Sequence, residues 1–128
     1  MSYYNTKTVN ESFSRVRTRI EEALKKQGFG IISEIDMDQK FREKLGIEFR
    51  RYKILGACSP KHAYLAVTAE EHIGLMLPCN VVMQEKGTDA VEVSVIDPVA
   101  SMQAVKNPHL EDIASEIRSK LREFLESL

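Results

Sequence analysis

Residues 80–97, NVVMQEKGTDAVEVSVID, carry the pattern that most restricts the fold of this chain. Val81 and Met83 precede Gly87 at two-residue spacing, and the valines of VEVSV follow it at the same spacing. This is the period of a β-strand that buries one face. Gly87 lies where a tight turn reverses the chain. The segment predicts a β-hairpin and a sheet that is mostly antiparallel.

Two other segments repeat their apolar residues at three- and four-residue spacing, which predicts two principal helices. The first is expected to begin with Asn10 as its N-cap and to end at Gly28. The second begins at Asn107 and Pro108 and is long enough to lie across a whole sheet. Shorter elements fill the remainder. We expect strands at 3–9, 29–35 and 48–57, and short helices at 36–46, 60–72 and 99–105.

These elements together predict an α+β fold with one mostly antiparallel sheet of about five strands and two principal helices. Their order is β-α-β-β-β-β-α, with short extra helices between them. The chain has 128 residues, near the commonest size of a single domain, and shows neither an internal repeat nor a linker. We therefore expect residues 1–128 to form a single domain.

Composition excludes several classes of partner. The formal net charge is -1, which offers no general attraction to nucleic acid or to an anionic membrane. Residues 40–53 hold six basic and two acidic side chains, a pattern typical of a solvated surface. No apolar run approaches the ~20 residues needed to span a bilayer, and the N-terminus lacks the apolar centre of a signal peptide. We expect a cytoplasmic protein without nucleic-acid or membrane partners.

Cys58 and Cys79 are the two cysteines, 21 residues apart and each close to a proline. Two interpretations are open: small buried hydrophobic residues, or a pair of ligands or redox thiols. Cys58 directly precedes a helix N-terminus, where amide dipoles favour a thiolate and would lower its pKa. If the flanking strands are parallel neighbours, Cys79 lies partway along its strand, and contact between the two sulfurs is left open.

A metal or ligand site near Cys58 is a further hypothesis. Cys58, His62 and Cys79 are candidate ligands for zinc or another transition metal, although the chain lacks the usual Cys-x2-Cys and His-Glu-x2-His spacings. As an alternative, His62 is a solvated residue of the first helical turn. Gly56 shares a strand face with Cys58 and leaves room for a small ligand there. Asp97 either caps the turn that follows it or contributes to a pocket.

The segments ILGACSP, GLMLPCNVV and IDPVASM resemble the bacterial and archaeal domain-of-unknown-function family 302. Ser59 stands where that family usually has asparagine, a change that keeps the ability to cap a helix. The resemblance implies a fold similar to the TATA-box-binding-protein type and a homodimer. It implies neither DNA binding nor a catalytic mechanism, because function belongs to sites rather than to folds.

Three hypotheses about function follow. The first is a small homodimeric binding module that holds a small molecule or a transition metal near Cys58. The second is a thiol-dependent redox protein or enzyme with Cys58 as its catalytic residue. The third is a purely structural interaction domain. The sequence leaves open whether the protein is an enzyme.

Overall fold

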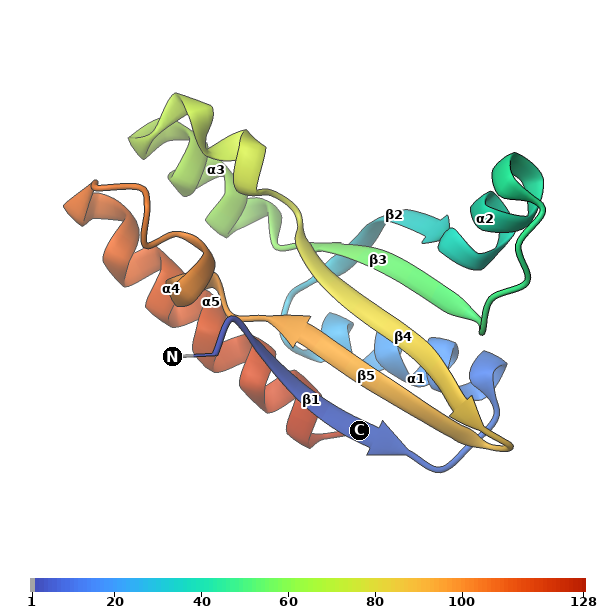
Figure 1. The fold of residues 1–128 in the computed structure, drawn as a ribbon. Coiled ribbons are helices and arrows are strands. Elements are labelled where there is room, and N and C mark those ends of the chain that lie inside the picture. Colours follow the sequence, from blue (N-terminus) through green and yellow to red (C-terminus); the bar gives the residue numbers. More distant parts are fainter. Residues whose placement is uncertain (1) are drawn as a thin grey trace.

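The computed structural model describes residues 2–128 and contains one five-stranded sheet (Figure 1). The strand order across the sheet is β1-β5-β4-β3-β2, and neighbouring strands are antiparallel throughout. The predicted α+β fold with an antiparallel sheet of five strands is confirmed. The strands are β1 (Tyr4–Val9), β2 (Gly30–Asp36), β3 (Tyr52–Cys58), β4 (Cys79–Gly87) and β5 (Ala90–Ile96).

Two long helices, α1 (Phe13–Lys26) and α5 (Pro108–Glu126), pack against one face of the sheet and leave the other face uncovered (Figure 1). No helix among residues 2–128 is long and apolar enough to cross a lipid bilayer. The shorter helices are α2 (Met37–Leu45), α3 (Pro60–Ala69), the 3-10 helix η1 (Glu71–Met76) and α4 (Pro98–Ser101).

The main core lies between the covered face of the sheet and the two long helices. The predicted hairpin supplies its centre, because the inward side chains of β4 and β5 are almost fully buried. The apolar stripes of α1 and α5 close over them, as their helical spacing predicts. The central side chains are Val81, Met83, Val91, Val93 and Val95 from the strands, Val16, Ile20 and Leu24 from α1, and Leu121 and Phe124 from α5.

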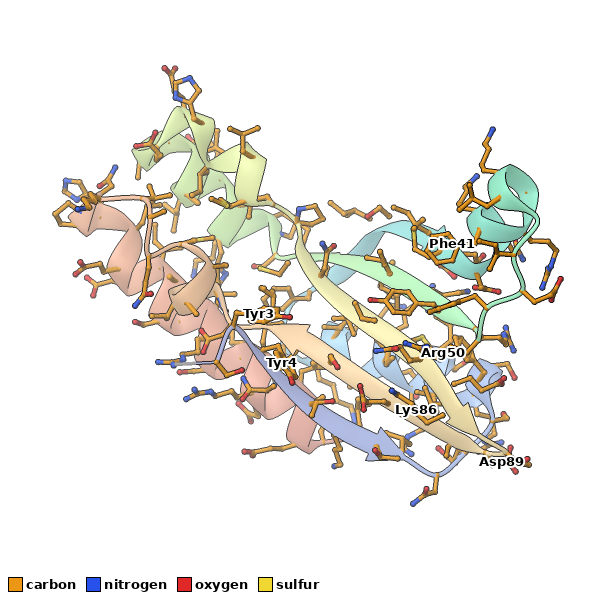
Figure 2. All side chains as sticks on the ribbon, viewed as in Figure 1. Tyr3, Tyr4, Phe41, Arg50, Lys86 and Asp89 are labelled. Atoms are coloured by element: carbon orange, nitrogen blue, oxygen red, sulfur yellow. The ribbon has the colours of Figure 1, made fainter. Side chains whose placement is uncertain are left out.

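Several predicted boundaries are wrong by a few residues. Ser12, rather than Asn10, caps α1, since its Oγ accepts a hydrogen bond from the Arg15 amide at 3.3 Å. This cap places Phe13 in the first turn, where it is buried. The hairpin turn is formed by Thr88 and Asp89, and Asp89 takes the positive φ of 49° that aspartate tolerates better than most residues. Figure 2 shows Asp89 at the tip of this hairpin.

The segment between β3 and β4 also differs from its prediction. Helix α3 ends at Ala69, and the chain continues as η1 instead of extending to residue 72. This change of helix places Ile73 beside Ala66 in a second, smaller core, which Met102, Leu110 and Ala114 complete. Because α3 and η1 pack on the N-terminal half of α5, they stand beyond the end of the sheet (Figure 1).

Candidate functional site

An apolar cavity of about 250 Å³ lies where α3 meets α5 and the ends of β3 and β4. We call it the Cys58 pocket. Its wall is mostly apolar, with two thiols, one hydroxyl and one imidazole as the polar groups. Its lining includes Cys58, Ser59, His62, Ala63 and Cys79. The pocket therefore gathers the three residues that the sequence marks as candidate metal ligands.

The two cysteines lie at the same end of the sheet. Strands β3 and β4 are antiparallel, and Ala57 is paired with Cys79. Cys58 ends β3 and Cys79 begins β4, so α3 and η1 return the chain to the point where it left the sheet. Both are free thiols; Cys79 is 5% exposed and Cys58 is half-buried.

Burial controls the acidity of these thiols. It raises the pKa of Cys58 above its ordinary value of 9.0. Burial, with a smaller contribution from nearby Cys58, raises the pKa of Cys79 to about 11. The expected lowering of the Cys58 pKa by the helix is therefore wrong. Cys58 lies outside the helix, before the N-cap Ser59, and the loss of hydration outweighs the helix dipole there.

His62 is buried in the wall of the pocket, and the expectation of a solvated residue is wrong. It is only 4% exposed, because α3 packs this face against α5. Its Nδ1 lies 2.7 Å from Oγ of Ser59, which is also buried. Ser59 occupies the N-cap position of α3, yet its side chain makes no capping hydrogen bond and turns to His62 instead.

The other ring nitrogen of His62 faces a carboxylate. Nε2 lies 3.1 Å from Oε1 of Glu116 on α5, close enough for an ion pair. The direction of this contact departs from that of a hydrogen bond, so Nε2 has no hydrogen-bonding partner among residues 2–128. The contact with His62 lowers the pKa of Glu116. Glu116 lies 54 residues beyond His62, and no spacing in the sequence could have connected the two.

Gly56 lies on the uncovered face of the sheet, opposite Ser33 of β2 and Asn80 of β4, and it does not line the Cys58 pocket. A Cβ atom at this position would collide with the Ser33 hydroxyl and the Pro78 ring. The room beside the glycine is thus occupied by these two side chains. Its small size allows the chain to pack closely as it enters β4.

Asp97 also lies outside the residues that line the pocket. It is 3% exposed and caps α4, where Oδ1 accepts hydrogen bonds from the Val99 and Ala100 amides. Its Oδ2 accepts a hydrogen bond from Nε of Arg118 at 3.0 Å. The predicted turn-capping role is confirmed, and the ion pair joins the end of β5 to α5.

The side chains of the pocket do not form a metal site. Cys58, His62 and Cys79 line one cavity, but nowhere in residues 2–128 do three His, Cys, Asp or Glu side chains cluster closely enough to hold an ion. Protonated thiols in an apolar wall are poor metal ligands, because metals bind the thiolate. The arrangement is chemically better suited to an uncharged molecule.

Comparisons of the sequence and of the fold both point to the same protein family. The family described as "Domain of unknown function DUF302" matches residues 5–128. The crystal structure of an uncharacterized conserved protein DUF302 from Bacillus stearothermophilus is similar, with a TM-score of 0.90, 26% sequence identity and 98% of each chain covered. No curated protein matches the chain. The chain belongs to the DUF302 family of domains of unknown function.

Proposed function

We propose that this protein is a small-molecule binding module and that the Cys58 pocket is its binding site. The observation that carries this proposal is the meeting of Cys58, Cys79, Ser59 and His62 in one apolar cavity. Ligand sites are typically apolar cavities with a few converging polar groups. The Cys58 pocket has the same composition, with four polar groups in an otherwise apolar lining.

The size of the pocket indicates the size of its ligand. A dry apolar cavity of about 150 Å³ is enough to hold benzene. Pockets for drug-sized ligands begin at about 300 Å³. A cavity of about 250 Å³ lies between these limits, which favours an uncharged molecule of one or two rings.

Binding agrees with the thiol chemistry better than catalysis does. A nucleophilic or redox cysteine needs a thiolate at neutral pH, but burial raises the pKa of both Cys58 and Cys79. Protonated thiols behave as small, polarisable apolar groups. They suit the wall of a pocket that receives an apolar ring.

Indole is a suitable probe, because the chain contains no tryptophan and indole fluorescence therefore reports the probe alone. We expect a saturable change in indole fluorescence with one site per chain. Ala63→Leu should weaken binding at least tenfold, since the added atoms enter the pocket. Ala104→Leu is the matched control, because Ala104 is exposed and does not line the pocket.

The binding proposal is overturned if indole does not bind, or if Ala63→Leu and Ala104→Leu bind it equally well. Thermal unfolding of both variants supplies the necessary check on folding. A lowered midpoint for Ala63→Leu alone would call for Ala63→Val, which narrows the same pocket with fewer added atoms.

The homodimer is a second proposal, and the uncovered face of the sheet is its interface. A groove of about 330 Å³ crosses this face, and Glu92 is the only charged residue among the ten that line it. Charged residues make up 29% of the whole chain. The groove also contains Tyr3, Tyr4 and Tyr52, of which the first two lie near the start of β1 (Figure 2). Few charges and many tyrosines are typical of interface cores.

Light scattering tests this interface. We expect a dimer at micromolar concentration, and we expect Val82→Arg to convert it to a monomer because a charge would be buried in the groove. Ala104→Arg is the control for an added charge elsewhere. A monomeric wild-type protein, or a Val82→Arg protein that remains dimeric, would contradict the proposed interface.

A further inference from the structure

A line of three polar side chains crosses from the surface of α5 into the Cys58 pocket. Glu116 is exposed, its Oε1 lies 3.1 Å from Nε2 of His62, and Nδ1 of His62 lies 2.7 Å from Oγ of Ser59. His62 and Ser59 are both more than nine-tenths buried, and both line the pocket. The charge of Glu116 determines whether the Ser59 hydroxyl offers the pocket a hydrogen-bond donor or an acceptor.

The carboxylate of Glu116 decides which ring nitrogen of His62 carries the proton. A neutral imidazole has one N–H and one lone pair. The state with the proton on Nε2 is favoured by electrostatics, because the positive side of the ring then lies 3.1 Å from the carboxylate oxygen even though the two are not aligned as a hydrogen bond. The lowered pKa of Glu116 agrees with a carboxylate that stays ionised beside the ring. Nδ1 is left with a lone pair.

The Ser59 hydroxyl must then donate its proton to Nδ1. A hydroxyl has one proton and two lone pairs, so Ser59 can present only an acceptor to the pocket. The thiols of Cys58 and Cys79 are weak hydrogen-bonding groups and compete little with it. The polar end of the pocket is therefore a single hydrogen-bond acceptor in an apolar wall.

We propose that the Cys58 pocket selects small aromatic molecules that carry one hydrogen-bond donor, and that Ser59 recognises this donor. The inference rests on the proposed binding function and deepens it by naming the ligand class. A ring N–H or a phenol hydroxyl meets the acceptor of Ser59. A ring with only acceptor atoms places a lone pair against a lone pair and leaves both without a partner.

Indole and benzofuran form a matched pair for the test. Both are bicyclic and of nearly equal size, but benzofuran has an oxygen acceptor where indole has its N–H. Indole binding is followed by fluorescence, and benzofuran binding by its displacement of indole. We expect indole to bind about tenfold more tightly than benzofuran, the effect of about one hydrogen bond in a buried site.

Two variants test the role of the line of side chains. Ser59→Ala removes the acceptor, so the preference for indole should fall to about equal binding of both probes. Glu116→Lys replaces an acceptor by a group with only donors. Nε2 then keeps its lone pair, Nδ1 donates to Ser59, and the hydroxyl proton turns to the pocket. The preference should therefore reverse in favour of benzofuran.

Glu123→Lys is the control, because Glu123 is an exposed residue of the same helix that does not line the pocket. It should keep the wild-type preference. Equal binding of both probes by the wild-type protein would overturn the inference while leaving the binding function intact. An unchanged preference in Glu116→Lys would overturn it as well. Failure of both probes to bind would overturn the binding function itself.

Discussion

Ala57 of β3 is paired with Cys79 of β4, and this single antiparallel pair determines where both cysteines lie. Cys58 follows Ala57 directly, so both cysteines lie at the end of the sheet next to α3 and line the same pocket. Helix α3, in the segment between the two strands, forms one wall of the Cys58 pocket. The pocket thus needs both the β3–β4 strand pair and helix α3.

Alkylation should distinguish the two thiols. Because burial raises the pKa of both, we expect slow reaction with iodoacetamide at pH 7 and a rate that increases as the pH rises past 9. Cys58 should react before Cys79, which is more buried and has a pKa of about 11. Mass spectrometry of Cys58→Ser and Cys79→Ser follows each thiol separately. Rapid labelling of Cys58 at pH 6 to 7 would instead support the thiol-enzyme hypothesis.

Gly56→Ala should destabilise the protein by about 1 to 3 kcal/mol, the usual effect of overpacking. The new methyl group would collide with the Ser33 hydroxyl and the Pro78 ring. Gly30→Ala is the matched control on the neighbouring strand, where no atom lies within 4 Å of the added Cβ. It should change the free energy of unfolding by less than about 1 kcal/mol. Urea denaturation measures both, and equal effects would contradict the packing argument.

Glu34 should make the protein sensitive to acid. A hydrogen bond from Arg17, and a smaller contribution from a hydrogen bond with Lys53, lower its pKa from the ordinary value of 4.5 to about 2. A depressed pKa in the folded state stabilises the fold above pH 4.5, and this contribution is lost as the pH falls from 4.5 through 2. In Glu34→Gln the loss of stability over this range should be smaller than in the wild type.

The control for this pH dependence is Glu22→Gln, on the exposed side of α1. Among the described residues Glu22 forms no ion pair, whereas Glu34 forms ion pairs with both Arg17 and Lys53. Denaturation midpoints measured from pH 2 to 7 should show the wild-type slope for Glu22→Gln. A Glu34→Gln protein with that same slope would show that the ion pairs do not act on stability.

Asp97 should be more important for folding than for binding. Asp97→Ala removes both the cap of α4 and the ion pair with Arg118, and we expect a loss of about 2 to 4 kcal/mol. Asp97→Asn keeps an acceptor for the cap, so its loss should be roughly half as large. Thermal unfolding measures the loss, and indole titration should show unchanged affinity in Asp97→Asn. Weaker indole binding without a loss of stability would place Asp97 at the ligand.

The success of the sequence predictions varied with the distance between the residues involved. The hairpin of residues 80–97 and the stripes of α1 and α5 follow from local spacing, and the structure confirms them. The cap of α5 is also local, since Asn107 accepts a hydrogen bond from the amide of His109. Asn10 is not the cap because α1 begins two residues later than predicted, where Ser12 accepts a hydrogen bond from the Arg15 amide.

The sequence by itself determined the class of fold, the antiparallel sheet and the family. Only the tertiary structure decided that Cys58 and Cys79 line one pocket, that His62 is buried, and that Glu116 lies next to it. The physical reason is that periodicity and capping depend on neighbouring residues. A pocket depends on how separate segments pack. Here α3 ends at Ala69 and continues as η1, and both pack against α5.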